Sequence, residues 1–291
     1  MFALLTLSLA LFCGSRLAAD TPPPDGTGAT AASRPSIAPP AAGDDPVLKA
    51  WKKADIGTRY RGMEGCFVLR EIGGSSPYLF NPGRCQTPLT PCSTFKITNA
   101  LIGLETGVLR DADHLLKWDG APQDIPGCGQ DLTLAGAIRH SCIWYFRKVA
   151  AGVGADRMQK YLDLFEYGNR DISGGLEQFW VQSSLTISAE QQAAFLERLY
   201  TDTLPLSSRA MDIVRGMLVL ESGADWTFSG KTGSGAENGV YTVAWFVGHA
   251  RHRGREFVFA ANVASDGKTN GPALRKIIFQ LAKDLTLIPA K

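Results

Sequence analysis

The order of strand-like and helix-like segments predicts an α+β fold. Two runs of apolar and β-branched residues come early, at 66–70 and 78–80, and three come late, at 227–230, 241–247 and 256–263. The residues between them carry helical patterns. This order predicts one antiparallel sheet built from both chain ends, flanked by helices, with a mostly helical lobe inserted in the middle. A site is expected in the cleft between the sheet and that lobe.

Capping residues and stop signals delimit the predicted helices. Asp45 precedes Pro46, which is the chemistry of a first helical turn. Ser188 and Gln191 have the capping-box pattern, and Asp156 is placed as a helix cap. The predicted helices cover residues 46–51, 93–105, 132–140, 143–149, 156–165 and 272–281, with a further one after Ser188.

A leader and a linker precede the predicted folded part. A short apolar run from Phe2 to Phe12 is followed by small residues, which is typical of a secretory signal peptide over 1–19, although no Lys or Arg precedes the run. Residues 20–45 are rich in Pro, Ala, Gly and Thr and predict a disordered linker. We therefore expect one globular domain over 46–291. The protein is expected to be exported to the periplasm and not to insert stably into a membrane.

The charge balance indicates neither a polyanionic partner nor an oligomeric state. The formal net charge is +2 at neutral pH and the charges are scattered, so no nucleic-acid groove is expected. The densest basic run, 251–255, lies between two strand-like segments and is interpreted as a solvated hairpin tip. The four histidines are scattered and no cysteine has zinc-site spacing, so we predict no metal site.

Five cysteines follow the leader, an odd number, so at least one thiol stays free or pairs between chains. Cys66 and Cys85 flank a predicted hairpin. Symmetric pairing about its turn places them opposite each other, which predicts a disulfide between them. The sequence assigns no partner to Cys92, Cys128 or Cys142.

The segment Ser93-Thr94-Phe95-Lys96 opens a long apolar helix. A serine and a lysine three residues apart lie on one helix face, and the helix N-terminus supplies unpaired N–H groups. This combination is typical of an activated nucleophile with its own base. A second match to the pattern, at 265–268, lies in residues with the composition of a turn. Only the first match is therefore a candidate site.

Further motifs follow the first in order: Ser141-Cys142-Ile143, Tyr167-Gly168-Asn169, Phe179-Trp180 and Lys231-Thr232-Gly233. Together with 93–96 they resemble the class D β-lactamases (oxacillinases), a family of serine penicillin-recognising enzymes. The resemblance runs through essentially the whole chain after Pro46. It implies a β-lactamase/transpeptidase-like fold and the hydrolysis of β-lactam antibiotics through a serine acyl-enzyme.

The resemblance implies roles for the nucleophile and its base. Ser93 opens the lactam and carries the acyl group, and Lys96 removes its proton. A lysine accepts a proton only when neutral, so Lys96 must lie in an apolar site. In the family this lysine is carboxylated by carbon dioxide and a tryptophan lies against it, a position that Trp180 matches. We therefore expect no cofactor other than N6-carboxylation of Lys96.

The resemblance assigns the remaining residues to substrate handling. Ser141 passes a proton to the departing lactam nitrogen, and Lys231 holds its hydrogen-bond network. Ile143 replaces the family's usual valine as an apolar wall. The substrate carboxylate is assigned to Thr232 and Arg275, although Arg275 also fits an ordinary surface arginine. The oxyanion hole is expected from the backbone N–H groups of Ser93 and of Ser234, which follows Gly233.

Other interpretations stay open at this point. The motif at 167–169 either shapes the cleft or takes part in the chemistry. Glu166 is interpreted as a solvated charge at a helix end, because no glutamate has the context of the class A deacylating residue. The same serine–lysine apparatus also fits a cell-wall transpeptidase or a non-hydrolytic penicillin-binding sensor module. In each case the expected partners are β-lactam small molecules.

Overall fold

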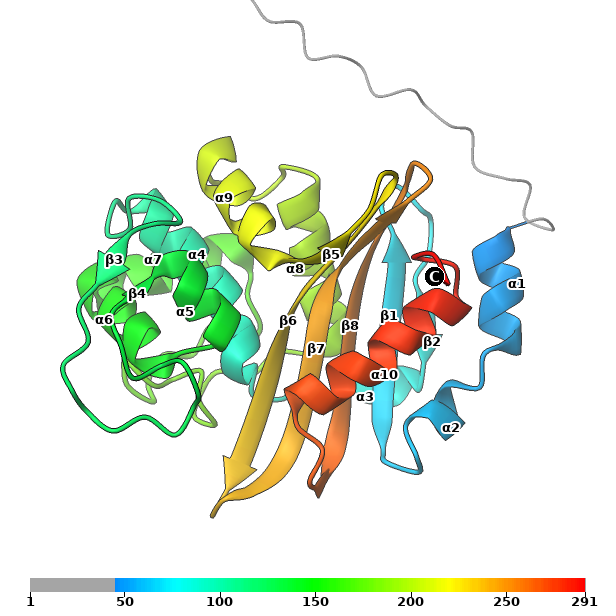
Figure 1. Ribbon diagram of the computed structural model, residues 1–291, viewed down its shortest axis with the longest axis horizontal. Helices are drawn as coiled ribbons and strands as arrows, with labels where there is room; N and C mark the ends of the chain where they lie inside the picture. The colour runs from blue at the N-terminus through cyan, green and yellow to red at the C-terminus, as the bar shows by residue number, and fades with distance from the viewer. Residues whose placement is uncertain (1–44, 291) are drawn as a thin grey trace, which may run out of the picture. The chain divides into compact units, whose positions relative to one another are not determined.

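A six-stranded antiparallel sheet takes its strands from both ends of the chain (Figure 1). In the computed structural model, which describes residues 45–290, the strand order is β2-β1-β8-β7-β6-β5. The strands are β1 (Gly65–Glu71), β2 (Tyr78–Phe80), β5 (Val219–Ser222), β6 (Trp226–Glu237), β7 (Val240–His252) and β8 (Arg255–Gly267). The late strands form consecutive hairpins, and β8 pairs with β1. The predicted α+β fold class is thus confirmed.

Helices cover both faces of the sheet. On one face lie α1 (Pro46–Lys53), α2 (Ile56–Arg59) and α10 (Gly271–Asp284), and on the other lies α8 (Ala189–Tyr200). Side chains of β1 alternate between the two cores: Phe67 and Leu69 pack with Leu274 of α10, and Val68 packs with the helical side. A strand buried on both faces carries apolar residues at successive positions, as β1 does.

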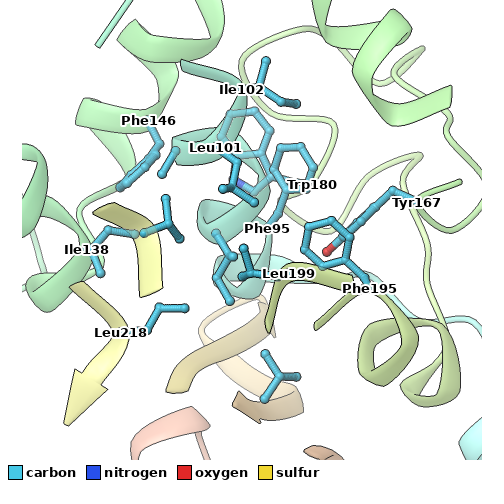
Figure 2. Close-up of a cluster of buried hydrophobic side chains, with 14 of the residues drawn as sticks. Phe95, Leu101, Ile102, Ile138, Phe146, Tyr167, Trp180, Phe195, Leu199 and Leu218 are labelled. Atoms are coloured by element: carbon cyan, nitrogen blue, oxygen red, sulfur yellow. The ribbon is translucent and has the colours of Figure 1, made fainter. Parts of the chain in front are cut away.

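The helical lobe lies between β2 and β5 in the chain. It contains α4 (Lys96–Glu105), α5 (Leu134–His140), α6 (Ile143–Val153), α7 (Ala155–Phe165) and α9 (Ser208–Leu218), with the short elements α3 (Pro82–Gln86), η1 (Cys92–Phe95), β3 (Leu115–Leu116) and β4 (Leu132–Thr133). All residues of α4 except the last are buried. A helix that is buried all round lies at the centre of its lobe, and Figure 2 shows Leu101 and Ile102 of α4 within that core.

Several predicted element ends shift in the structure. The helix expected over 93–105 begins as a 3₁₀ turn, and its α-helical part starts at Lys96. Asp156 is not a cap, because Gly154 occupies the position before α7. The capping box of Ser188 and Gln191 is present, and Asp45 caps α1 as predicted. The predicted leader 1–19 and the predicted linker, apart from Asp45, lie outside the described residues.

The predicted disulfide between Cys66 and Cys85 is wrong. Among residues 45–290 the bridge is Cys128–Cys142, and both Cys66 and Cys85 are buried free thiols. The β1–β2 pairing ends at Phe67 and Phe80, and Cys85 belongs to α3 beyond it. The Cys66 sulfur accepts a hydrogen bond from Asn262 Nδ2 at 3.2 Å, and the Cys85 thiol donates to the Phe80 carbonyl.

The basic run 251–255 forms a hairpin tip between β7 and β8, as predicted, but Arg255 is not solvated. Its guanidinium donates to Asp45 Oδ1 at 2.8 Å and to both oxygens of Glu71, at 2.7 and 2.8 Å. Tyr78 Oη donates to Asp45 Oδ2 at 2.9 Å. Burial raises the pKa of Asp45, but the hydrogen bonds from Arg255 and Tyr78 outweigh it and leave the pKa below its usual value. This network joins the residue before α1 to the sheet.

Arg255→Met is expected to lower the free energy of unfolding by about 3 kcal/mol, because it leaves two partly buried carboxylates without a countercharge. Urea unfolding measures the change. A carboxylate with a lowered folded pKa contributes stability above an unfolded pKa of about 4. The difference between wild type and variant should therefore shrink as the pH falls through and below that value.

Arg251→Met is the matched control, because Arg251 lies on the same hairpin with an exposed side chain. We expect it to change the free energy of unfolding by less than about 0.5 kcal/mol. Equal losses in the two variants would contradict a specific role for the Arg255 network.

Candidate active site

Ser93 and Lys96 form a hydrogen-bonded pair at the start of the central helix. Ser93 lies in the 3₁₀ turn η1, and Lys96 is the first residue of α4. With three residues per turn, side chains at i and i+3 of a 3₁₀ helix eclipse each other. Lys96 Nζ accordingly donates to Ser93 Oγ at 2.6 Å. The structure therefore brings the predicted nucleophile and base into direct contact.

The Lys96 side chain is fully buried. Its amine lies 5.8 Å from the centroid of the Phe146 ring, and the preceding residue, Phe95, stacks on Trp180 at 5.4 Å (Figure 2). Burial lowers the pKa of Lys96 well below its ordinary value, and the nearby charge of Lys231 lowers it further. A neutral amine accepts a proton, so this environment suits a general base.

Trp180 has a buried N–H group without a partner. The ring is wholly buried, and Nε1 makes no hydrogen bond within residues 45–290. Buried indole N–H groups normally find an acceptor. The unpaired donor next to the Phe95–Lys96 turn therefore marks a place where an additional acceptor fits.

Ser141 and Lys231 form a second hydrogen-bonded pair, from the lobe and the sheet. Lys231 Nζ on β6 donates to Ser141 Oγ at 2.8 Å and to the Thr232 carbonyl at 3.1 Å. Ser141 occupies the left-handed region, with φ of 63°, at the end of α5 and before α6. Burial lowers the pKa of Lys231 to about 7. Near neutral pH, Lys231 is therefore present both as the ammonium and as the neutral amine.

Strand β6 approaches the nucleophile turn closely because it carries glycines. A Cβ added at Gly233 would lie 2.9 Å from the Pro91 carbonyl oxygen, and one at Gly235 would lie 3.2 Å from Cys92 Sγ. The partner strand β5 pairs with β6 only at residues 227–229, so the 231–234 stretch of β6 faces η1. Gly233 therefore sets the width of the cleft at Ser93.

The N-terminus of α10 packs against the other side of the same stretch. Gly271 N donates to Ser234 Oγ at 2.9 Å, and a Cβ on Gly271 would come within 2.6 Å of the Gly233 carbonyl. This contact places Arg275, one turn further along α10, in one groove with Lys231 and Thr232. The two predicted carboxylate-binding residues thus share a groove.

The remaining motif residues shape the walls of the site. Tyr167 is buried and packs edge-on against Phe95 at 5.6 Å. Asn169 Oδ1 accepts from Thr186 N, and a Cβ on Gly168 would clash with the Thr186 carbonyl at 2.0 Å. These contacts favour the cleft-shaping interpretation of 167–169. Ile143, the first residue of α6, is partly buried two positions after Ser141.

Glu166 is not among the charges that shift the pKa of Lys96. It caps the C-terminal end of α7 in the left-handed conformation and is exposed. It lines a surface hollow with Arg170 and Arg198. This position fits the solvated charge that the sequence indicates. Within residues 45–290, no group of three or more His, Cys, Asp or Glu side chains is arranged to hold a metal ion, and no helix is long and apolar enough to span a membrane.

Comparisons with known proteins decide the family. The model of the penicillin binding protein transpeptidase domain matches residues 58–282. The beta-lactamase OXA-10 of Pseudomonas aeruginosa is 41% identical over 221 residues, which cover 74% of this chain and 82% of the relative. The chain belongs to the class D β-lactamase family. The predicted family is thereby confirmed.

Further relatives of this class D β-lactamase agree. The probable beta-lactamase YbxI of Bacillus subtilis is 38% identical over 215 residues, which cover 74% of this chain and 80% of the relative. A solved class D β-lactamase structure from Bacillus subtilis superposes with a TM-score of 0.77 at 36% identity and covers 82% of this chain and 98% of that one.

Polar side chains that the sequence reasoning missed hold the turn η1, which carries Ser93. Gln192 Nε2 donates to Thr94 Oγ1 at 2.8 Å, and Thr94 Oγ1 donates to the Pro91 carbonyl at 2.7 Å. Trp245 Nε1 donates to the Thr90 carbonyl at 2.9 Å. Gln192 and Trp245 come from α8 and β7, far from Ser93 in the chain, so no local pattern indicated them.

The Cys128–Cys142 disulfide lies directly beside Ser141. It joins Cys142, the residue after Ser141, to the segment between β3 and β4 across a sequence separation of 14. The Trp144 indole donates to the Cys128 carbonyl at 2.7 Å, so two tethers hold that segment to the start of α6. The disulfide thus fixes the turn that presents Ser141 to Lys231. Its only sequence signal was a cysteine inside the Ser-Cys-Ile motif.

Cys128→Ser is expected to reduce kcat/KM for a β-lactam by up to about 100-fold, because a displacement of Ser141 by about 1 Å misaligns proton transfer. It should also lower the free energy of unfolding by about 3 kcal/mol, the usual effect of a loop of this size. Steady-state kinetics at a temperature where the variant is folded, and urea unfolding, measure the two effects.

Gln130→Ala is the control, because it changes the same segment and leaves the disulfide intact. Its kcat/KM should stay within about twofold of wild type, as for exposed surface changes. If Cys128→Ser lost stability but kept its kcat/KM, the disulfide would have no positioning role.

Proposed function

We propose that this chain hydrolyses β-lactams through an acyl-enzyme on Ser93, with Lys96 as general base in a carbon dioxide-derived, N6-carboxylated form. The observation that carries the proposal is the buried amine of Lys96, which contacts Ser93 Oγ at 2.6 Å and has a strongly lowered pKa. The names of the relatives as β-lactamases support the substrate class.

Acylation uses both serine–lysine pairs. The Lys96 side chain takes the proton of Ser93, and Ser93 Oγ forms a bond to the lactam carbonyl carbon. The developing oxyanion accepts hydrogen bonds from the backbone N–H groups of Ser93 and Ser234. When the C–N bond breaks, Ser141 donates its proton to the lactam nitrogen, and the Lys231 ammonium returns a proton to Ser141 across their 2.8 Å contact.

The surroundings of Lys96 fit a carboxylated side chain. A neutral lysine adds carbon dioxide with loss of one proton, and the buried amine has the lowered pKa that this addition requires. The unpaired Nε1 of Trp180 fits as a donor to the added carboxylate. When bound, the group supplies an anionic base that takes a proton from Ser93 in acylation and from water in deacylation.

Carboxylation of Lys96 would also replace the repulsion between the two lysines with an attraction. Two ammonium groups at Lys96 and Lys231 repel each other, and this repulsion lowers the pKa of Lys96. An anionic Lys96 side chain instead attracts the Lys231 ammonium and opposes the desolvation that otherwise brings the pKa of Lys231 to about 7. Lys231 then stays protonated as donor to Ser141 and as countercharge for an anionic substrate.

Substrate orientation follows from the sheet edge and α10. Thr232, Arg275 and Lys231 line one groove and bind the substrate carboxylate, for which a guanidinium fork is suited. Gly233 lets the acyl group lie between β6 and η1. Ile143 and Trp180 supply apolar surface near the reacting centre, on α6 and beside Phe95 respectively.

Export to the periplasm is part of the proposal. Disulfides form and persist in oxidising compartments, and Cys128–Cys142 supports that environment. The apolar run at 2–12 supports a cleaved leader. A non-hydrolytic penicillin-binding sensor module and a cell-wall transpeptidase are the alternatives. Both hold the acyl-enzyme, so steady turnover of a chromogenic cephalosporin, as opposed to one stoichiometric burst, separates hydrolysis from them.

Ser93→Ala is expected to abolish acylation and leave the fold intact, because it removes the nucleophilic oxygen and, with it, the hydrogen bond from Lys96 Nζ but no apolar core contact. Mass spectrometry after penicillin treatment should show one adduct per chain on wild type and none on the variant. Circular dichroism checks the fold. An adduct that persisted on Ser93→Ala would exclude Ser93 as the nucleophile.

The activity of degassed enzyme is expected to rise when bicarbonate is added and to fall at acidic pH. Protonation of the Lys96 amine competes with carbon dioxide addition, so the base is present at higher pH and is lost as the pH falls. Carbon-13 NMR with labelled bicarbonate should detect a bound carboxylate in wild type and none in Lys96→Ala. Full-rate turnover of degassed enzyme at pH 5 would contradict carboxylation.

Trp180→Phe tests the unpaired indole. It keeps an aromatic ring but removes the N–H donor, and a hydrogen bond to a charged group is worth about 1.5–3 kcal/mol. We therefore expect the variant to need at least about tenfold more bicarbonate for half-maximal activity. Trp118→Phe is the control, because its indole donates to the Ala121 carbonyl in an exposed segment. An unchanged bicarbonate requirement in Trp180→Phe would remove Trp180 from the carboxylate site.

A further inference from the structure

A groove continues from the carboxylate-binding residues along the lobe. It has a volume of about 710 Å³ and lies between α5, α9, β5 and the N-terminal turns of α10. Lys231 and Thr232 form part of its lining, so it is continuous with the active site. Neither the acyl transfer nor the oxyanion hole uses the rest of this groove.

One wall of the groove is apolar and exposed. Ile213 and Met217 come from α9, and Val219 and Leu220 come from β5. Val219 is 43% and Leu220 36% exposed, and both are among the large apolar side chains most exposed in residues 45–290. Adjacent exposed apolar residues beside a reactive centre indicate contact with a ligand group.

The groove is also cationic. Arg139 on α5 and Arg275 on α10 both line it, both are exposed, and neither makes a hydrogen bond or ion pair with another described residue. The acidic residue of the lining, Asp212, is already paired with Arg215. Arg139 lies in the last turn of α5, where a cation suits the helix dipole. Because the Arg139 side chain is exposed and has no partner among residues 45–290, its guanidinium is available to a ligand.

The chemistry of bicyclic β-lactams decides which substituent meets this groove. The lactam nitrogen is bonded to the carbon that carries the carboxylate, and in cephalosporins the adjacent ring carbon carries the C3 substituent. With the nitrogen at Ser141 and the carboxylate at Thr232 and Arg275, the C3 substituent points along the groove. The acylamino group is attached on the opposite side of the lactam ring and points away from it.

We propose that this groove is a specificity site for the C3 substituent of cephalosporins and that Arg139 favours anionic over cationic substituents. The apolar wall accommodates the ring or chain of the substituent, and the Arg139 guanidinium selects its charge, because Arg275 is engaged by the substrate carboxylate. The inference rests on the proposed hydrolysis, since it concerns the same bound substrate. Arg139 touches the substituent and takes no part in bond breaking.

The test compares three cephalosporins that share one C7 side chain and carry an anionic, a neutral aromatic or a quaternary ammonium C3 substituent. For wild type at low salt we expect kcat/KM to be about tenfold higher for the anionic than for the cationic compound. Arg139→Gln should reduce that ratio to about threefold, mainly by raising KM for the anionic compound. Arg139→Lys retains the positive charge and should leave the ratio near that of wild type. Added salt should weaken the preference, because the charges are exposed.

Two further variants make the result specific. Lys276→Gln is the control, because Lys276 is the neighbour of Arg275 on α10 but lines a different hollow. It should leave the ratio unchanged. Leu220→Glu places an anion on the apolar wall and should reverse the preference toward the cationic compound. All four substitutions, at Arg139, Lys276 and Leu220, should leave penicillin turnover within about twofold of wild type.

The possible outcomes distinguish a failure of the proposed hydrolysis from a failure of the proposed specificity site. Absence of penicillin turnover by wild type would overturn the proposed function itself. Normal penicillin turnover with equal kcat/KM for the three cephalosporins, or with an unchanged ratio in Arg139→Gln, would overturn the specificity site. An equal loss on penicillin and on all cephalosporins in Arg139→Gln would assign Arg139 to the reaction instead.

Discussion

The site depends on the burial of one amine, that of Lys96. Its side chain has no exposed surface and lies at the junction of η1 and α4, under the aromatic rings of the lobe core. An ammonium is disfavoured there, because desolvation penalises the charged form. Only the neutral amine of a lysine can accept a proton, and only the neutral amine reacts with carbon dioxide. The long apolar helix and the ring of aromatic residues are therefore requirements of the chemistry as well as of stability.

The second lysine extends this electrostatic arrangement across the cleft. Lys231 comes from the sheet, and its charge acts on Lys96 from the lobe. Lys96 and Lys231 lie near each other because β6 approaches η1 closely. This approach is possible because Gly233 has no side chain. The relative position of the sheet and the lobe thus determines how strongly the charge of Lys231 acts on Lys96. The Cys128–Cys142 bridge acts on the same geometry by holding the turn of Ser141.

Substrate selection is separate from this centre in space. The residues proposed to bind the substrate carboxylate belong to β6 and α10, whereas the groove beyond them is bounded by α5, α9 and β5. Arg139 is not among the charges that shift the pKa of Lys96 or of Lys231, and solvent screens its exposed guanidinium. Discrimination among substituents can therefore change at Arg139 or Leu220 without a change at Ser93. Lys96 is buried because α4 lies at the centre of the lobe. Arg139 and Leu220 in the groove are exposed because α5 and β5 lie at the surface.

Local periodicity and short spacings predicted the order of strands and helices, the Ser93–Lys96 pair and the Lys231 motif, because each of these depends on residues close together in the chain. The sequence also placed the capping box at Ser188. It did not determine which cysteines are bonded, since Cys85 follows a turn into α3 and leaves the hairpin register. It misjudged Arg255, whose partners Asp45 and Glu71 come from the other end of the chain. Contacts between distant segments depend on how the lobe and the helices pack on the sheet, which no local pattern of residues specifies.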